Sequence, residues 1–547
     1  MDFRFYIPIG IIVIFGLLFF DFISSKRKRE KIAVEFGSVP ENEIEFESLE
    51  FMWEEKKKNM DVGEYIDEAT WNDLDMDSVF SRINNCQTSI GEEYLYSRLH
   101  ELDFNREGFK ERERLIETFD SDHALRLNLQ ELLSNAGKAS FNNLRDYCYN
   151  LESEQLKPVF LYNILAFLPI LLLGLLVFMP GAMLIPFLLS YAVNCIIYLF
   201  ANKKLQKKIY TINYFSSLLW SAGKICKKMN GSDNVIIKNL EESYRLFGKT
   251  VSKLSSVMQQ RLSDIEAIML YFRMMMLSNV RRYNSVIKSL RNNKAAFEQL
   301  LDSLGEIDAS IAILSYRKSL MYFTHPEFRD EQSFVLSEMY HPLLNNPVPN
   351  SVEIEKNCLI TGSNASGKST FIKMFGINLI LAQTINTCSA KSFVMKPSFV
   401  ITSMAVRDNI LSGESYYITE VKSLKRILDK VQDVYCVCIV DEILRGTNTI
   451  ERIAASYSVL KHIETLDCLC MVATHDIELT KLLSDCYENF HFSEKISENE
   501  ITFDYIINCG PTHTKNAIKL LSFLGFKKEI ITDAENAVKK IESGSKD

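Results

Sequence analysis

The sequence has no excess of basic residues. Its 62 lysines and arginines are outnumbered by 70 aspartates and glutamates, which leaves a formal net charge of −8. A chain coated in positive charge for nucleic-acid binding is therefore excluded, and any such contact must come from a local patch. Cysteine is also scarce. The 12 cysteines among 547 residues occur singly or as C-x-C inside apolar runs, so they make no disulfide framework and indicate a reducing compartment.

Charge is missing from the N-terminal segment. Phe5–Ile23 is apolar apart from Asp21, and at 1.5 Å per residue it is about long enough to cross a hydrocarbon core. A cleaved signal peptide has its positive charge before the apolar stretch and a small-residue site after it. Here no A-x-A site is present and the basic residues follow, so we predict an uncleaved signal anchor with a cytoplasmic flank. These basic residues are Lys26, Arg27, Lys28, Arg29 and Lys31.

A second charge-free segment lies in the middle of the chain. Pro158–Asn202 has 45 residues without one charge, and Met179-Pro180-Gly181 breaks it near its centre. Lysines flank both ends, which predicts a transmembrane hairpin with both ends in the cytoplasm. The alternative is a buried helical hairpin in a large soluble core, although such helices rarely lack charge on every face.

Proline is absent from residues 187–325, which favours long helices. Acidic residues are also missing between Glu266 and Glu298. Basic residues in that stretch form the best local candidate for a phosphate-binding face that contacts DNA. The alternative is an ordinary solvated helix face. The candidate DNA-binding residues are Arg281, Arg282, Lys288, Arg291 and Lys294.

A phosphate-binding motif appears after Asn350. Val352–Ile360 predicts a strand, Phe371–Met374 opens a helix, and T-G-S-N-A-S-G-K-S-T between them contains the pattern G-x-x-x-x-G-K-[ST]. In this context Lys368 reaches the β- and γ-phosphates and Ser369 ligates Mg²⁺. The predicted ATP-binding residues of the loop are Gly362, Ser363, Asn364, Ala365, Ser366, Gly367, Lys368, Ser369 and Thr370.

Two further predicted strands end in groups suited to ATP hydrolysis. The strand Cys436–Val440 is followed by Asp441 and Glu442. Asp441 suits the magnesium shell, and Glu442 is placed to polarise the attacking water. The strand Cys468–Ala473 is followed by Thr474 and His475, and a histidine there can sense the γ-phosphate, because strand C-termini build the site in such sheets. The alternative for His475 is a structural role.

These motifs resemble, in order, those of the MutS family of mismatch-repair ATPases. Residues 441–449, D-E-I-L-R-G-T-N-T, are similar to D-E-I-G-R-G-T-S-T, with Leu444 in place of a glycine. The phosphate loop resembles T-G-P-N-M-G-G-K-S-T, and residues 340–342 resemble R-H-P. Residues 415–421 resemble S-T-F-M-V-E-M, residues 473–476 resemble A-T-H-Y, and 510–529 resembles the closing helix-turn-helix. The likeness covers about 331–540 and continues more weakly at 67–99, which is similar to the start of the family's helical core.

The resemblance implies a mechanism. Two ATPase domains face each other in a homodimer, Ser415 of one subunit completes the phosphate site of the other, and ATP acts as a clamp that moves helical levers. The family's mismatch-reading and connector domains have no counterpart, so mismatch recognition is in doubt. The phenylalanine that stacks on adenine is replaced around Val348. Tyr505, at the position of a stacking histidine, is the candidate to take over.

Two other function classes stay open. Leu411-Ser412-Gly413 resembles the L-S-G-G-Q signature of ABC transporters, although three spans are few for a permeation path and Arg445-Gly446-Thr447 does not match. A membrane scaffold that uses nucleotide only to dimerise, without DNA, is the other alternative.

Together these features predict an α/β P-loop ATPase domain of the ABC type, an all-α core and lever domain, and three transmembrane helices. We expect a membrane-anchored, Mg²⁺-dependent ATPase that dimerises on ATP and binds DNA in a repair or recombination role. We expect the protein to be a multi-pass protein of the cell's inner, or plasma, membrane, where it contacts the lipid bilayer. Its ATPase domain is expected in the cytoplasm. The predicted parts are a signal anchor (1–25), a juxtamembrane linker (26–66), the first helical core segment (67–157), the transmembrane hairpin (158–202), the second core and lever segment (203–330), the ATPase domain (331–510) and a dimerisation helix-turn-helix (511–547).

Overall fold

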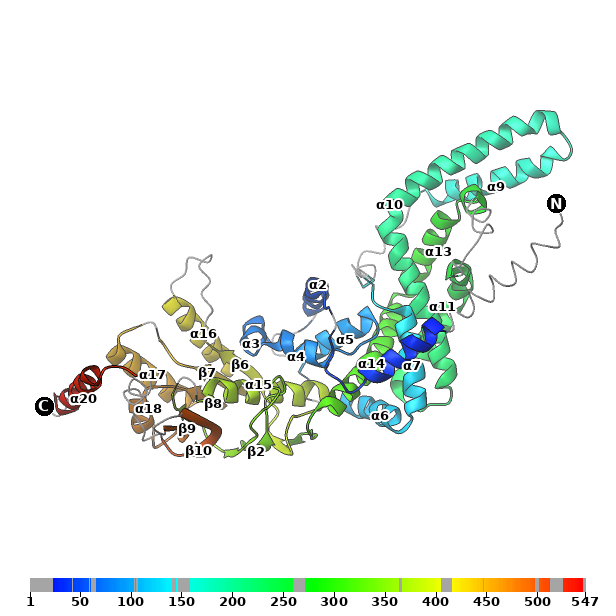
Figure 1. The fold of residues 1–547 in the computed structure, drawn as a ribbon. Coiled ribbons are helices and arrows are strands. Elements are labelled where there is room, and N and C mark those ends of the chain that lie inside the picture. The colour runs from blue at the N-terminus through cyan, green and yellow to red at the C-terminus, as the bar shows by residue number, and fades with distance from the viewer. Residues whose placement is uncertain are drawn as a thin grey trace. The chain divides into compact units, whose positions relative to one another are not determined.

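The computed structural model describes residues 23–544 with internal gaps. The gaps are 42, 59, 61–64, 103, 105–106, 140–143, 146–157, 259–270, 364–365, 405–415, 446, 497–500 and 512–524. The described residues form two compact units (Figure 1). A helical unit takes in residues up to 60, 83–97 and 107–319, and an α/β unit takes in 61–82, 98–106 and the chain from 320 onward. This confirms the predicted combination of an α/β part with a helical part.

Helices alone make up the described secondary structure of the helical unit. Besides residues 23–35, they are α2 (Phe46–Lys57), α5 (Ser89–His100), α6 (Glu107–Ser121), α7 (His123–Ala136), α9 (Val159–Leu176), α10 (Pro180–Lys228), α11 (Val235–Met258), α13 (Ser278–Asn292) and α14 (Lys294–Ser319). Phe297 of α14 meets Phe215 of α10 and Phe247 of α11 edge to face, with ring centroids 5.0 and 6.4 Å away. All three rings are fully buried, so an aromatic core joins these helices.

Helix α10 is continuous over 49 residues, about 74 Å at 1.5 Å per residue. Pro180 opens it, where a missing N–H leaves no intrahelical hydrogen bond unmade. Leu218, Leu219 and Ala222 in its second half are fully buried, whereas its first half is exposed and apolar. One helix therefore belongs both to the core of the unit and to the charge-free segment.

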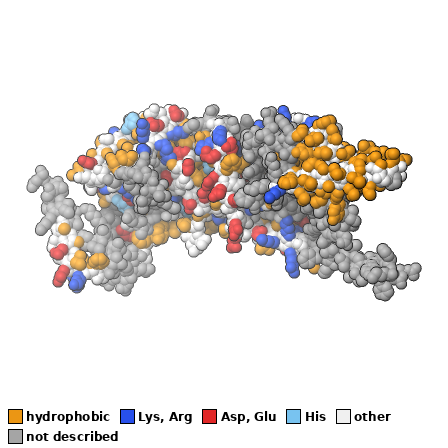
Figure 2. All heavy atoms as spheres, turned by 90° about the horizontal axis from the view of Figure 1, so that it is seen from above, with side chains coloured by type: hydrophobic (Ala, Val, Ile, Leu, Met, Phe, Trp, Pro, Cys, Tyr) orange, Lys and Arg blue, Asp and Glu red, His pale blue; other side chains and the backbone are white. Residues whose placement is uncertain are grey.

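Helix α9 and the first half of α10 form a hairpin that extends from the rest of the helical unit (Figure 1). Its large apolar side chains are exposed, among them Phe160, Leu171 and Leu189 at 74%, 62% and 64%. Figure 2 shows hydrophobic side chains gathered over the hairpin. An apolar surface of this extent marks a membrane or protein interaction site rather than a face left in water.

The prediction of three transmembrane helices needs correction. Among the described residues one helix, Gly181–Ala201, is long and apolar enough to cross a membrane, and it is 11% buried. The other arm of the hairpin contributes the shorter apolar helix Phe160–Leu176, because α9 ends before the turn that leads into Pro180. The predicted N-terminal span lies outside the described residues, except for Ile23.

Residues 26–66, expected to be a juxtamembrane linker, contain folded helices. Leu49, Met52 and Trp53 of α2 are buried, and their i, i+3, i+4 spacing was a helix signal beneath the acidic composition. Two of the basic residues that follow the N-terminal apolar segment contact the C-terminal part of α7. Lys28 donates to the carbonyl of Ser134 at 2.7 Å, and Arg29 pairs with Glu131 at 3.1 Å. The described residues up to 60 are thus part of the helical unit.

The α/β unit contains two sheets. Its helices are α3 (Glu68–Asp73), α4 (Met76–Ile83), α15 (Lys368–Ile385), α16 (Tyr416–Val431), α17 (Thr449–Ile463), α18 (Ile477–Leu482) and α20 (Lys528–Gly544). Its strands are β1 (Glu327–Phe328), β2 (Phe334–Met339), β3 (Asn350–Ile354), β4 (Cys358–Thr361), β5 (Ser392–Met395), β6 (Phe399–Ser403), β7 (Cys436–Asp441), β8 (Cys468–Ala473), β9 (Glu488–Ile496) and β10 (Ile501–Cys509). The larger sheet has the order β10-β9-β4-β8-β7-β6, parallel except at β10, and the smaller has the order β1-β5-β2-β3.

The strand predicted over Val352–Ile360 is in fact two strands in different sheets. β3 belongs to the smaller sheet and β4 to the larger one. Asn357, between them, accepts a hydrogen bond from the Cys470 N–H at 2.7 Å and accepts another at its carbonyl from Glu488 N–H at 2.8 Å. These bonds hold the polar residues 355–357, which separate β3 from β4. The other two predicted strands, β7 and β8, lie where the sequence predicted them.

A short segment from early in the sequence is built into the α/β unit. The Asp73 carboxylate at the end of α3 accepts hydrogen bonds from the Thr402 hydroxyl at 2.7 Å and from the Met404 N–H at 3.0 Å. Thr70 accepts one from the Thr402 N–H. Residues 67–82, expected in the first core segment, are therefore attached to β6.

A buried carboxylate organises the start of α5 in the helical unit. Asp308 of α14 accepts hydrogen bonds from the Gln87 N–H at 3.0 Å, the Thr88 N–H at 2.8 Å and the Thr88 hydroxyl at 2.6 Å. Burial raises the pKa of Asp308 to about 6, against the opposing effect of these donors. The carboxylate thus links α14 to residues 87–88.

We expect Asp308→Asn to lower the melting temperature of the purified full-length protein. The amide nitrogen accepts no hydrogen bond, so a buried donor loses its partner at a cost of about 1–3 kcal/mol. Because the folded pKa lies above the unfolded value, wild-type stability gains from proton uptake as the pH falls through 6, and the variant lacks this gain. The difference between the two proteins should widen from pH 7.5 to pH 5. Asp233→Asn, at a fully exposed position, is the control, and equal melting curves would contradict the assignment.

Candidate nucleotide-binding site

The phosphate loop joins β4 to α15 at the carboxyl end of the parallel strands. Gly362 and Gly367 adopt φ values of 147° and 105°, which favour glycine. A Cβ on Gly362 would lie 2.9 Å from the carbonyl oxygen of Phe492, and one on Gly367 would lie 3.2 Å from the Tyr505 ring. Helix α15 begins at Lys368, so its N-terminus faces the loop, as an anion site requires.

Lys368 lies inside the loop. Its ammonium group donates to the carbonyl oxygens of Gly362 at 2.7 Å and Ser363 at 2.9 Å. Burial lowers the pKa of Lys368 to about 8, opposed by the charges of Glu442 and Asp441. At pH 7 the side chain is therefore mainly a cation, held within the loop against two of its carbonyl oxygens.

The other two predicted catalytic residues lie beside Lys368. β8 lies between β4 and β7, so its end adjoins both neighbouring strand ends. The Glu442 N–H donates to the Ala473 carbonyl at 2.9 Å. The Glu442 carboxylate is 3.1 Å from Nε2 of His475, and the Lys368 ammonium is 3.3 Å from the same nitrogen. Three residues from separate strand ends thus form one cluster.

The charges of this cluster fix its hydrogen bonding. Burial is the largest single influence and acts to raise the pKa of Glu442, but the His475 hydrogen bond and the charges of Arg445, His475 and Lys368 together lower it overall. An ionised Glu442 accepts, so we assign the hydrogen to Nε2 of His475. Lys368 and His475 are then two adjacent donors. A phosphate oxygen is the kind of acceptor that such a pair favours.

The residues expected to hold magnesium fit that ion. Asp441 is buried at the end of β7, and among the described residues its Oδ1 has no hydrogen-bond partner. A buried carboxylate oxygen without a donor is favourable when a cation lies against it. Ser369, the second residue of α15, is exposed. A carboxylate and a hydroxyl are hard oxygen ligands of the type that Mg²⁺ takes.

A small cavity adjoins the phosphate loop. It has a volume of about 160 Å³, and Val348, Gly367, Thr370 and Tyr505 are among its lining residues. The ladder between β9 and β10 is irregular between Phe503 and Ile507, and within this bulge Tyr505 has a φ of 56°. The two positions considered for adenine stacking therefore share one cavity.

Asn350, which the sequence did not single out, holds this bulge. Its side-chain amide donates to the Tyr505 carbonyl at 3.0 Å and to the Val348 carbonyl at 3.2 Å. Its Oδ1 accepts from the Ile507 N–H at 2.8 Å. No sequence pattern predicts the hydrogen bonds of Asn350 to Tyr505 and Ile507, because these residues are more than 150 positions away in the sequence.

The neighbourhood of Glu442 shows why Leu444 departs from the family pattern. Leu444 has a φ of 57°, which a glycine would adopt without strain, but its side chain is 4% exposed. Burial of the leucine thus offsets the backbone strain. Arg445 forms an ion pair with Glu442, a contact that the motif alone did not reveal.

The remaining predicted residues differ in what the structure says of them. Ser363 donates to Glu494 at 2.7 Å and Ser366 donates to the Ser363 carbonyl at 2.8 Å. The positions outside the described residues are Asn364, Ala365, Gly446, Leu411-Ser412-Gly413 and Ser415.

The predicted DNA-binding residues lie in the helical unit. Arg281 faces α9, with its Nε donating to Asn163 at 3.0 Å, and Lys288 is exposed. Arg291 and Lys294 are exposed as well, whereas the side chain of Arg282 is outside the description. The five residues do not make one continuous face on α13, because Lys294 opens α14.

Comparison with known proteins agrees with this geometry. The family model for MutS domain V matches residues 358–542. The DNA mismatch repair protein MutS of Streptococcus uberis is 27% identical over 270 residues, covering 46% of this chain and 32% of that protein. The MutS protein of Pseudothermotoga lettingae is 27% identical over 275 residues, or 48% and 34%. MutS protein homolog 4 of Mus musculus is 26% identical over 329 residues, or 57% and 33%. The chain spans about a third of the length of these relatives.

We expect Tyr505→Ala to weaken ATP binding, measured by titration calorimetry of the full-length protein. Loss of base–aromatic stacking costs about 1–3 kcal/mol, roughly a 5- to 150-fold higher Kd. Tyr505→Phe keeps the ring and should bind like the wild type. Asn350→Ala removes the bonds that hold the bulge and should weaken binding while the ring is still present. Unchanged affinity in Tyr505→Ala would exclude the stacking role.

Proposed function

Because residues 358–542 belong to the MutS family as its domain V, we propose that this protein is a MutS-like ATPase whose nucleotide cycle acts on a membrane-attached helical unit. The single observation that carries the ATPase proposal is the cluster of Lys368, Glu442 and His475 at three strand ends. Next to Glu442 in the sequence is Asp441, whose Oδ1 has no hydrogen-bond partner among the described residues.

The residues divide the chemistry among themselves. Loop N–H groups, the N-terminus of α15 and Lys368 bind the phosphates. Asp441 and Ser369 would hold Mg²⁺, which supplies charge neutralisation across the phosphates. Glu442, ionised through His475 and Arg445, accepts a proton from the attacking water as its oxygen bonds to the γ-phosphorus and the bridging P–O bond breaks. His475 orients Glu442 through the hydrogen on its Nε2.

Substitution separates binding from hydrolysis. Lys368→Ala should raise the Kd for ATP at least tenfold, because it removes the cation inside the loop. Glu442→Ala should bind ATP with near wild-type affinity but lose at least 99% of turnover, because the carboxylate acts on water. Binding is measured by calorimetry and turnover by phosphate release. Equal loss of binding in both variants would reject the division of roles.

We also propose that the α9–α10 hairpin lies in a lipid bilayer, in the plasma membrane, with the ATPase domain in the cytoplasm. The support is the exposed apolar surface of α9 and Gly181–Ala201, with no charge from Pro158 to Asn202. A protein partner is the competing explanation. Lipid is favoured because the apolar side chains lie all around the hairpin, including Phe160, Ile185 and Phe200 at 70% exposure or more, whereas a partner would cover one side.

Cysteine accessibility tests the membrane proposal. In the full-length protein reconstituted in phosphatidylcholine vesicles, Leu189→Cys should resist a water-soluble maleimide and react once the protein is unfolded in detergent. Leu246→Cys is the matched control, since both leucines are more than half exposed but only Leu189 lies on the hairpin. Labelling is read at each site by mass spectrometry. Rapid labelling of both cysteines would reject insertion.

Homodimerisation and DNA binding form a second level of the proposal. The family supports a dimer completed by Ser415 in trans, and ATP favours it only if the closed state binds ATP more tightly. Exposed Lys288, Arg291 and Lys294 support DNA contacts through phosphates, which carry no sequence information. Binding to duplex DNA with and without ATP separates this role from the alternatives of an ABC-type ATPase and a nucleotide-gated scaffold.

A further inference from the structure

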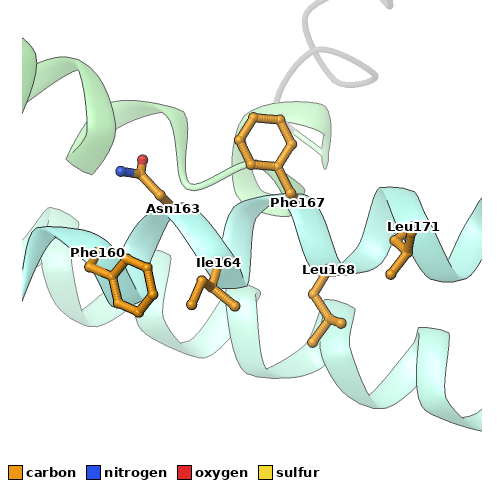
Figure 3. A pocket seen from close by; sticks show the side chains of 6 residues that line it. All are labelled: Phe160, Asn163, Ile164, Phe167, Leu168 and Leu171. Atoms are coloured by element: carbon orange, nitrogen blue, oxygen red, sulfur yellow. The ribbon is translucent and has the colours of Figure 1, made fainter.

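Arg281 is directed to the hairpin rather than to open solvent. Its Nε donates to Oδ1 of Asn163 at 3.0 Å, and its guanidinium carbon lies 4.7 Å from the ring centroid of Phe167. Both partners are on α9, and Figure 3 shows them pointing to the same side of that helix. The guanidinium group has five N–H donors, of which this hydrogen bond uses one.

Asn163 and Phe167 also line a shallow groove. Its lining is apolar apart from one amide and consists of Phe160, Asn163, Ile164, Phe167, Leu168 and Leu171. The residues follow the i, i+3, i+4 rows of α9 for about 16 Å, so the groove runs along the helix (Figure 3). A long apolar groove therefore has a cation beside it, because Arg281 contacts two of its lining residues.

The place of Arg281 beside this groove is fixed. Ala166, Tyr198 and Leu277 form a buried cluster between the hairpin and the turn that precedes α13. Asn194 of α10 donates from one amide group to the carbonyls of Leu165 and Met275, both at 2.7 Å. These contacts attach the start of α13 to the base of the hairpin, and Arg281 follows one turn later.

The surroundings resemble a membrane interface more than a nucleic-acid surface. Tyr271 and Phe272, next to this turn, are 61% and 56% exposed, as aromatic residues are at headgroup level. No acidic residue occurs between Glu266 and Glu298, so the cation is not neutralised locally by its own segment. A duplex phosphate at Arg281 would face exposed Phe160 and Phe167, with which DNA makes no favourable contact.

We propose that this groove binds one anionic phospholipid, with its phosphate on Arg281 and an acyl chain along α9. The site rests on the proposed insertion of the hairpin, since the groove meets lipid only there. The hydrogen bond to Asn163 orients the guanidinium group, and the ring of Phe167 lies against it. The stem of an arginine near a helix end reaches the interface in this way. Arg281 is then a lipid-binding residue of the helical unit.

Native mass spectrometry of the full-length protein tests the site. The protein is released from nanodiscs of equal palmitoyl-oleoyl phosphatidylcholine and palmitoyl-oleoyl phosphatidylglycerol, and retained lipid is counted per subunit. We expect one retained phosphatidylglycerol in the wild type, and an occupancy about fivefold lower in Arg281→Gln, as one cation near the surface provides. Asn163→Leu should fall in the same direction because it releases the guanidinium. Lys288→Gln, which removes the same charge from the same helix, is the matched control and should keep the lipid.

The outcomes are distinguishable. Leu189→Cys protected from maleimide together with no preference for phosphatidylglycerol would overturn the lipid site and leave membrane insertion standing. Labelling of Leu189→Cys would reject both. An equal fall in Arg281→Gln and Lys288→Gln would show diffuse surface charge instead of a site. Unchanged lipid retention with weakened duplex DNA binding in Arg281→Gln would assign Arg281 to DNA. Unaltered ATP turnover and Leu189→Cys protection in each variant confirm that the protein is folded.

Discussion

The helical unit depends on the continuity of α10. It is one continuous helix from Pro180 to Lys228, although Pro186 inside it has no N–H to donate, so the exposed apolar half and the buried half belong to a single element. The buried half contributes Phe215 to the aromatic core with α11 and α14, and the exposed half carries Asn194, which holds α9 and the turn before α13. A tilt of the hairpin therefore displaces the core helix with it. No flexible linker between them is described that would absorb such a motion.

The nucleotide site depends in a similar way on compensation between charges. Lys368 is desolvated, which on its own would favour the neutral amine, and the carboxylates of Glu442 and Asp441 oppose that loss. Burial acts to raise the pKa of Glu442, but the hydrogen bond from His475 and the charges of Arg445, His475 and Lys368 together lower that pKa, so Glu442 stays ionised. Each of these charges is therefore favoured by the other together with neighbouring groups. The strand order places them together, because β8 lies between the strands that carry the loop and the carboxylates.

The sequence was most informative where chemistry requires particular residues. The glycines at 362 and 367, Lys368 and the two strands ending at Asp441 and Ala473 follow from local patterns, since a phosphate loop needs backbone freedom and a cation. Patterns of composition were less reliable. Acidic residues concealed the helix Phe46–Lys57, whose buried face consists of three residues. The nine residues Val352–Ile360, read as one strand, contain parts of two strands of different sheets that are separated by a polar Glu-Lys-Asn sequence. The contacts of Asn350 and Arg281 could not be predicted from local sequence patterns, because their partners are more than 100 residues away.

Hydrogen bonds between α3 and β6 attach an early segment of the chain to the large sheet, and no sequence motif predicts this attachment. The Asp73 carboxylate is largely buried and receives bonds from Thr402 and Met404 at the very end of β6, and burial raises its pKa. Arg426 of α16 adds an ion pair to Asp67 at 2.9 Å. Each hydrogen bond contributes about 1 kcal/mol, so displacing the end of β6 without α3 would cost several kcal/mol. The end of β6 and helix α3 are therefore held together within the α/β unit.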